Sequence, residues 1–241
     1  MNGKDAARLP AVAILAGGLA SRLGPIAAGR PKSMVEVAGE PFIAHQLRRL
    51  AGDGVTKAVL CLGHLGDQIA AFVGDGRRFG LEVGYSFDGD VALGTGGALR
   101  RALPQLGESF FVLYGDSFLP VAYAPVADAF RSAGQPALMT VLRNAGRWDR
   151  SNASLVQGFV HYDKRAPRPD MEHIDYGLAV LSAAALDGWP EDRGFDLADV
   201  YHRLSLAGVL AGFEVFSRFY EIGSPAGLAE TEAFLGAARP A

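Results

Sequence analysis

The sequence has little of several features that would each point to a class of protein. Its 241 residues contain one cysteine, so no disulfide can form within the chain. No window approaches the roughly 18 uninterrupted apolar residues of a membrane-spanning helix, and residues 1–10 are too polar for a secretory signal. The formal net charge is −3, without the basic excess typical of nucleic-acid binders. These absences predict a cytoplasmic protein that binds neither membranes nor nucleic acid.

Two common catalytic arrangements are also missing. The five histidines show no i, i+4 or His-x-His pair, so they do not predict a zinc site. Cys61 lies in the apolar run AVLCLG, which favours a packed core thiol over a nucleophile. No Ser-His-Asp or Cys-His set is evident. Any catalysis therefore has to come from other residue types.

Apolar runs typical of strands alternate with helical patterns along the first 142 residues. The runs predicted as strands are Val12–Ala16, Ala58–Leu62, Leu81–Phe87, Phe110–Tyr114 and Ala137–Leu142. The segments predicted as helices are Pro41–Ala51, Gly66–Val73, Gly97–Leu103 and Val121–Ala133. In the first helix, Ile43, Leu47 and Leu50 share the apolar face, and Gln46 is expected to fall off it. The alternation predicts a Rossmann-like three-layer α/β/α fold with a mainly parallel sheet.

The chain becomes polar, with many glycines and prolines, after about residue 143. This stretch predicts an inserted antiparallel ribbon with loops at one edge of the sheet, a place where substrate contacts commonly lie. A strand at Ile174–Ser182, a helix at Asp196–Ala207, a strand at Val209–Phe213 and a final helix from Pro225 are expected next. We expect one domain over residues 1–241, with parts at 11–142, 143–223 and 224–241.

The first chemical motif joins a strand to a glycine loop and two cations. The apolar run stops at Gly17-Gly18, and Arg22 and Lys32 follow. Glycines at the carboxyl end of a strand let backbone amides approach phosphate oxygens, and Arg and Lys add positive charge. The loop is neither a Walker loop nor a dinucleotide GxGxxG motif. It predicts a polyphosphate site; the alternative is an ordinary turn with a surface Arg and Lys.

The segment GGLASRL followed by PK resembles the signature GGxGTRLxPxTxxxPK of the sugar-phosphate nucleotidylyltransferases. Ala20 and Ser21 replace the usual Gly and Thr, and the Pro-x-Thr arrangement is absent. The resemblance implies the fold of the nucleotide-diphospho-sugar (GT-A-like) transferases. It also implies the reaction of an NTP with a sugar 1-phosphate to give an NDP-sugar and pyrophosphate. The implied nucleotide-binding residues are Leu15, Ala16, Gly17, Gly18, Arg22, Lys32, Gly63, Gly94, Thr95 and Asp116.

Two acidic residues are candidates for a magnesium site. Asp116 follows the apolar run in FFVLYGDS, where a carboxylate needs a cation or donors beside it; the alternative is a helix N-cap with Ser117. Within the resemblance, Asp116 matches the family's metal-binding Asp. Glu221, in EIGSPAGLAE, stands where the family motif DIGTPEDL has its second metal ligand. Ser224-Pro225 equally predicts an N-cap followed by the first helical residue.

Three further elements carry the resemblance. The loop LGTGGALRRAL, with Gly94 and Thr95, is expected to open a helix that ends at Pro104, and the family places it over the nucleobase. Asp163-Lys164 matches a Glu-Lys-Pro region, so Lys164 is implied to bind the sugar phosphate and Asp163 a hydroxyl; a surface charge pair is the alternative. Gly177, in IDYGLAVL, matches a strand at which the sugar approaches the backbone.

The implied catalytic residues are Arg22 at the pyrophosphate end, Lys32 at the α-phosphate and Asp116 at the metal. The chain most resembles the branch with heptose-1-phosphate and mannose-1-phosphate guanylyltransferases, which favours GTP. Thymidylyl-, uridylyl- and cytidylyltransferases of glucose 1-phosphate stay open, as does a homo-oligomer. A glycosyltransferase would instead use Asp88-Gly89-Asp90 as a DxD metal motif, although Asp-Gly is an ordinary turn. A non-catalytic nucleotide-sugar-binding homologue is the remaining alternative.

Overall fold

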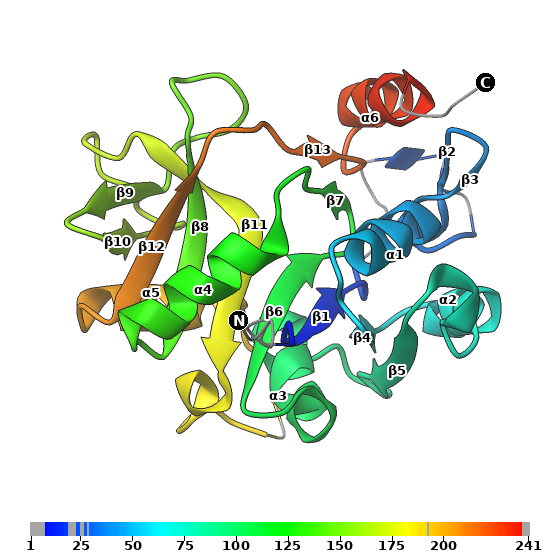
Figure 1. Ribbon diagram of the computed structural model, residues 1–241, viewed down its shortest axis with the longest axis horizontal. Helices are drawn as coiled ribbons and strands as arrows, with labels where there is room; N and C mark the ends of the chain where they lie inside the picture. The colour runs from blue at the N-terminus through cyan, green and yellow to red at the C-terminus, as the bar shows by residue number, and fades with distance from the viewer. Residues whose placement is uncertain (1–7, 19–22, 25–26, 28, 192, 238–241) are drawn as a thin grey trace, which may run out of the picture.

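A nine-stranded mixed sheet runs through the computed structural model of the chain (Figure 1). The structure describes residues 8–18, 23–24, 27, 29–191 and 193–237. From one edge to the other, the strands are β5 (Glu82–Phe87), β4 (Lys57–Leu62), β1 (Ala11–Leu15), β6 (Ser109–Tyr114), β11 (His173–Ser182), β8 (Ala137–Arg143), β12 (Leu210–Val215), β10 (Phe159–Tyr162) and β9 (Ala153–Val156).

The sheet is fully parallel from β5 to β6 and mixed beyond it, where β8 and β12 are its one parallel pair among the described strands, so the expectation of a mainly parallel sheet is not confirmed. Strands β5, β4, β1 and β6 are parallel neighbours, whereas β11 is antiparallel to both β6 and β8. Residues 144–172, between β8 and β11, contain no helix that could make the crossover a parallel pair needs. The hairpin of β9 and β10 lies where a ribbon was expected, but it continues the main sheet beyond β12.

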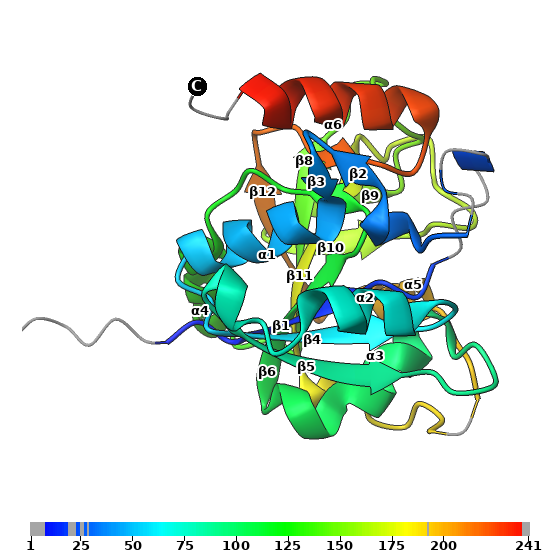
Figure 2. The same cartoon turned by 90° about the vertical axis from the view of Figure 1, so that its right-hand side faces the viewer.

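Helices cover both faces of this sheet, as the three-layer prediction requires (Figures 1 and 2). One face packs against α1 (Phe42–Gly52), α2 (Gly66–Val73) and α4 (Tyr123–Ala133). The other packs against α3 (Gly94–Leu106) and α5 (Leu197–Leu206). Alternate residues of β1 show the division: Val12 and Ile14 belong to the first cluster and Ala13 to the second, because successive side chains of a strand point to opposite faces.

A smaller assembly lies at the α6 end of the molecule, at the top of Figure 1. It comprises the 3₁₀ turn η2 (Lys32–Met34) and the pairs β2 (Glu36–Val37) with β3 (Glu40–Pro41) and β7 (Ser117–Phe118) with β13 (Tyr220–Glu221), under α6 (Pro225–Ala237). Two further 3₁₀ turns are η3 (Arg77–Phe79) and η4 (Ala183–Leu186). A third apolar cluster, with Phe42, Phe118 and Ile222, holds this assembly together. None of the helices among the described residues is long and apolar enough to cross a bilayer.

Two expectations about helices were wrong in detail. Helix α3 runs through Pro104 to Leu106 instead of ending at the proline. The proline stands in the last turn, so the helix continues for only two residues before Gly107, which has φ +83° and a conformation that ends helices. Gln46 is buried in the apolar face of α1, at 2% exposure. Its position is i+3 from Ile43 and i−4 from Leu50, which is the spacing of one helical face.

Candidate active site

The carboxyl ends of β1, β4 and β6 meet at a cavity of about 250 Å³, which we call the first cavity. Ligands of open α/β sheets bind at this edge. Eight of the ten residues expected to bind the nucleotide line it: Leu15, Ala16, Gly17, Gly18, Lys32, Gly94, Thr95 and Asp116. Gly63 lies directly behind, packed against Gly17, and Arg22 lies outside the described residues.

Close backbone packing requires two of the glycines around this cavity. A Cβ atom on Gly17 would lie 3.0 Å from the backbone nitrogen of Gly63, and one on Gly115 would lie 2.9 Å from the Cα of Ala16. Both positions therefore exclude a side chain. A Cβ on Gly18 would meet nothing within 4 Å, so Gly18 is the glycine that leaves space open. Gly115, just before Asp116, was not among the predicted site residues.

The start of α3 packs against the loop before α5. A Cβ on Gly96 would lie 2.3 Å from the ring of Phe195, and the amides of Gly96 and Gly97 both donate to the carbonyl of Phe195. The Thr95 hydroxyl donates to Asp196 at 2.8 Å. These groups serve the protein's own packing, so the backbone at Gly96 and Gly97 is not free to contact a base. Gly94 and Thr95 nevertheless line the first cavity.

Lys32 and Asp116 form an ion pair although they lie 84 residues apart in the sequence. The Nζ atom of Lys32 is 3.0 Å from Oδ2 of Asp116, and their side chains are 14% and 29% exposed. The ammonium of Lys32 balances the negative charge of Asp116 at the end of β6. Ser117 begins the strand β7 rather than a helix, so the N-cap interpretation of Asp116 was wrong.

Gln46, on α1, fixes the turn that carries Asp116. Its side-chain nitrogen donates to the carbonyl of Tyr114 at 2.9 Å and to that of Ser117 at 2.7 Å. One buried amide thus holds the last residue before the turn and the first after it. Buried polar groups need such partners. The two bonds satisfy the side-chain nitrogen of Gln46, whereas its Oε1 has no hydrogen-bond partner among the described residues.

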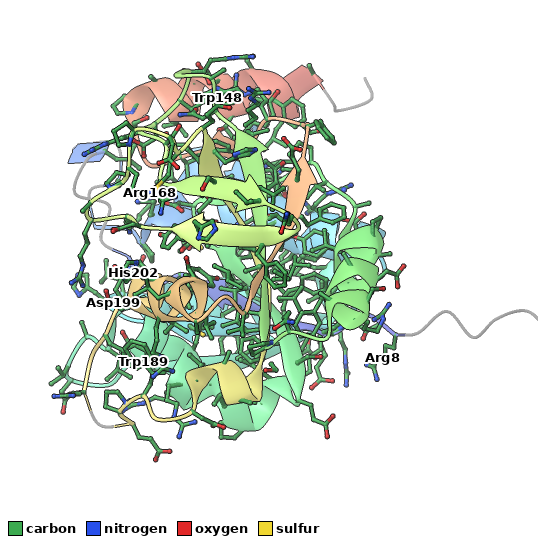
Figure 3. The ribbon with its side chains drawn as sticks, turned by 90° about the vertical axis from the view of Figure 1, so that its left-hand side faces the viewer. Arg8, Trp148, Arg168, Trp189, Asp199 and His202 are labelled. Atoms are coloured by element: carbon green, nitrogen blue, oxygen red, sulfur yellow. The ribbon has the colours of Figure 1, made fainter. Side chains whose placement is uncertain are left out.

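A second cavity, of about 570 Å³, adjoins the first and shares Tyr114 and Asp116 with it. Predicted residues Gly177 and Glu221 line it. Its polar lining includes carboxylates, an amide and two guanidinium groups: Asp116, Asp149, Asp175, Glu221, Glu230, Asn152, Arg147 and Arg218. Trp148, labelled in Figure 3, is also in the lining. Such a mixture of donors and acceptors suits a polyhydroxylated ligand.

Asp175 is a half-buried carboxylate of the second cavity that the sequence-based predictions missed. It accepts a hydrogen bond from the amide of Gly177 at 3.0 Å. Burial raises the pKa of Asp175 to about 6, against the opposing effects of this amide and of the Lys164 charge. Gly177, with φ +98°, stands at an irregularity of β11. An acidic residue inside the apolar run IDYGLAVL is unusual, and this pattern could have indicated Asp175 as a candidate site residue.

The Glu221 carboxylate is tied to the start of α6. It accepts hydrogen bonds from the amide of Gly223 and, at 2.8 Å, from the hydroxyl of Ser224. The Ser224 hydroxyl in turn accepts from the amide of Gly227 at 3.0 Å, so the predicted N-cap followed by Pro225 is confirmed. A Cβ on Gly227 would lie 2.1 Å from Glu221 Oε1, so glycine is required there.

Asp116 and Glu221 fit a magnesium ion by their chemistry. Both line the second cavity, and their carboxylate oxygens have lone pairs beyond those used by Lys32, Gly223 and Ser224. The part of the chain that the structure describes contains no group of three or more metal-ligating residues. One or two carboxylates completed by substrate phosphates and water is the usual magnesium arrangement.

Asp163 and Lys164 are placed outside the linings of both cavities. Asp163 accepts from the amides of Arg165 and Ala166, and these bonds lower its pKa. The Nζ atom of Lys164 lies 3.9 Å from a carboxylate oxygen of Asp196, and its side chain is 59% exposed. The structure therefore shows a turn and a surface pair here, near the start of α5.

The sequence Asp88-Gly89-Asp90 does not act as one unit. Gly89 has φ +81°, and Asp90 is exposed on a turn, which confirms the turn interpretation. Asp88 alone lines the first cavity, and the amide of Leu93 donates to its Oδ2 at 3.3 Å. Burial raises the pKa of Asp88. Asp88 is therefore a candidate residue of the first cavity. In the sequence it was considered only as part of the metal-binding DxD motif of a glycosyltransferase.

Curated relatives of this chain include proteins named as uridylyl-, thymidylyl- and guanylyltransferases. An N-acetylmuramate α-1-phosphate uridylyltransferase of Caulobacter vibrioides is 29% identical over 93% of this chain and 96% of its own. The Neisseria meningitidis enzyme of the same name is 36% identical over 50% of this chain and 51% of its own. In two further curated relatives the matched segment spans 36% and 55% of their length.

The fold has a counterpart among solved structures. The structure of HddC from Yersinia pseudotuberculosis in complex with GMP-PN has a TM-score of 0.76 over 94% of this chain and all of that one, at 23% identity. A family model described as nucleotidyl transferase matches residues 11–150, which include Lys32, Asp88 and Asp116. The chain therefore belongs to the nucleotidyl transferase family.

Proposed function

We propose that this protein transfers a nucleotidyl group from an NTP to a sugar 1-phosphate, giving an NDP-sugar and pyrophosphate. The Lys32–Asp116 pair carries the proposal: it lies in the first cavity, and Asp116 also lines the second. Two adjoining cavities with a charged pair at their boundary suit a reaction between two phosphorylated substrates. The curated relatives named above act on sugar 1-phosphates.

The chemistry needs positioning and charge rather than a nucleophilic side chain. The phosphate oxygen of the sugar 1-phosphate is already an anion, so it can attack the α-phosphate without a general base. Holding two polyanions in line supplies about 7–11 kcal/mol of the barrier. Lys32, held in place by Asp116, offers a fixed cation at the α-phosphate, and Arg22 would bind the pyrophosphate end. A magnesium ion on Asp116 and Glu221 would neutralise charge on both substrates' phosphates.

We assign the NTP to the first cavity and the sugar 1-phosphate to the second. Residues 11–142 then form the nucleotide part and residues 143–223 supply most of the sugar part, with residues 224–241 as a closing helix. The carboxylates and amide of the second cavity, Asp175 and Asn152 among them, support this by offering acceptors to sugar hydroxyls. Gly177 would admit the sugar to the backbone of β11.

For the substrates, we propose GTP with a heptose or mannose 1-phosphate. UTP with N-acetylmuramate 1-phosphate is the second candidate, because a relative of nearly the same length carries that name. The test is a pyrophosphate-release screen of GTP, UTP, CTP, ATP and dTTP against a panel of these sugar 1-phosphates with magnesium. Release that depends on both substrates is expected. The proposed function would be overturned if the folded protein released no pyrophosphate with any of the tested combinations of NTP and sugar 1-phosphate.

Lys164→Ala tests the division between the two substrates. Its ammonium lies 3.9 Å from a carboxylate oxygen of Asp196, and its charge lowers the pKa of Asp175 in the second cavity. We therefore expect about tenfold weaker binding of the anionic sugar 1-phosphate. Binding of NTP without sugar should be unchanged in titration calorimetry. Lys57→Ala, at the opposite end of the β4 strand from Gly63, is the matched control. Equal losses of NTP and sugar affinity in Lys164→Ala would contradict this assignment of the substrates.

A further inference from the structure

The first cavity contains a carboxylate, that of Asp88, which has no role in the proposed phosphate transfer. Asp88 follows β5, and Asp116 follows β6. Strands β4 and β1 lie between these two, so the strand ends are about 14 Å apart, three strand spacings. Both carboxylates line one cavity. From an α-phosphate at Lys32 and Asp116, an NTP extends in two directions, as the nucleoside and as the β,γ-diphosphate. The diphosphate is repelled by a carboxylate, so the base is the part of the NTP suited to lie at Asp88.

The Asp88 carboxylate is held in place but not neutralised. Its Oδ2 accepts from the Leu93 amide and lies 3.4 Å from the position of a Cβ on Gly63. Arg101, whose charge opposes the rise in the pKa of Asp88, donates to the backbone carbonyls of Phe87 and Asp88 instead of the carboxylate. No ion pair of Asp88 occurs among the described residues. Its remaining acceptor positions are available to a ligand.

The bases differ in what they present to such a group. Guanine carries two adjacent donors, N1–H and N2–H₂, on its pairing edge. Uracil and thymine present one N–H between two carbonyls, and adenine and cytosine present an amino group beside an acceptor nitrogen. An ionised carboxylate only accepts, so it bonds both guanine donors and opposes an acceptor in every other base. Small residues beside it, Ala92, Gly94 and Ala98, leave room for a flat ring.

We propose that Asp88 selects guanine by accepting hydrogen bonds from N1–H and N2–H₂ of the base. The proposal rests on the function given above, with the NTP in the first cavity. It makes Asp88 a specificity residue that touches the substrate far from the reacting phosphates. Its loss should therefore act on the choice of base more than on the transfer step.

Inosine triphosphate tests this directly, because it equals GTP without the 2-amino group. For the wild-type protein we expect kcat/KM to be about tenfold or more higher with GTP than with ITP. Asp88→Asn should lower kcat/KM for GTP and narrow the GTP/ITP ratio to about threefold or less, because an amide keeps one acceptor and adds a donor. Asp90→Asn, the exposed carboxylate two residues away, is the control and should leave the ratio unchanged.

Each outcome bears on the proposal. Equal kcat/KM with GTP and ITP in the wild-type protein overturns it, and this measurement does not depend on the folding of any variant. An unchanged GTP/ITP ratio in folded Asp88→Asn overturns it as well. Activity with UTP or dTTP in preference to GTP would leave the proposed function standing and refute the role of Asp88. Pyrophosphate release with no NTP at all would overturn both.

Discussion

Asp116→Asn is expected to lower kcat by about a hundredfold or more, which corresponds to ~2.7 kcal/mol in the barrier. The change keeps the size of the side chain and removes the charge that pairs with Lys32 at 3.0 Å. It also removes one of the two carboxylates that would hold magnesium between the substrates. Steady-state pyrophosphate release at saturating magnesium measures the effect, and the circular dichroism spectrum establishes that the variant is folded.

Asp90→Asn supplies the matched control for this loss. Asp90 lies on an exposed turn outside the first cavity, so its removal should leave turnover and magnesium dependence nearly unchanged. The reverse pattern, with Asp116→Asn active and Asp90→Asn inactive, would favour a glycosyltransferase that uses the DxD sequence. Near-normal turnover of folded Asp116→Asn alone would reject the role of the Lys32–Asp116 pair.

The sequence predicted that the loop after β1 and Asp116 after β6 lie at the same edge of the sheet, but it did not predict the ion pair of Asp116 with Lys32. An apolar run followed by glycine or aspartate marks the carboxyl end of a buried strand, and parallel strands bring such ends to one edge. Strands β1 and β6 are direct neighbours, so Gly17 and Asp116, which come just after them, line the same cavity. Lys32 lies in η2, well beyond the end of β1, so strand order alone does not place it beside Asp116. The helices α2 and α5 and the cap at Ser224 followed equally from local patterns.

Other features depended on contacts that no local pattern records. In the sequence, the loop that contains Gly96 was expected to contact the nucleobase. In the structure, the ring of Phe195, about a hundred residues away in the chain, leaves no room for a side chain at Gly96. The antiparallel direction of β11 follows from a connection without a helix. The sequence indicated only a turn at Asp88. Asp88 lines the first cavity because β5 pairs with β4 in a register that brings the end of β5 beside it. Tertiary contacts decided each of these cases.

Asp175→Asn is expected to stabilise the protein at pH 8 while it impairs activity. The pKa of Asp175 is raised from 3.8 to about 6 by burial, so the folded state favours the protonated carboxyl. This group therefore costs no stability below about pH 4, its cost grows between about pH 4 and pH 6, and the cost is nearly constant at higher pH. At 1.36 kcal/mol per pKa unit, the cost at pH 8 is roughly 2–3 kcal/mol. An asparagine, which is neutral at every pH, can still accept from the Gly177 amide.

Urea unfolding at pH 4, 5, 6 and 8 measures the free energy of unfolding of both proteins. The advantage of Asp175→Asn should be largest at pH 8 and should disappear towards pH 4. Asp149→Asn, which removes an exposed carboxylate from the same cavity, is the matched control. In kinetics, Asp175→Asn should raise the KM for sugar 1-phosphate, because the carboxylate lines the cavity to which we assign that substrate. If the unfolding free energies of the wild-type protein and Asp175→Asn differed by the same amount at every pH, ionisation of Asp175 would not destabilise the folded protein. A carboxylate retained despite that cost is expected where a substrate needs its charge.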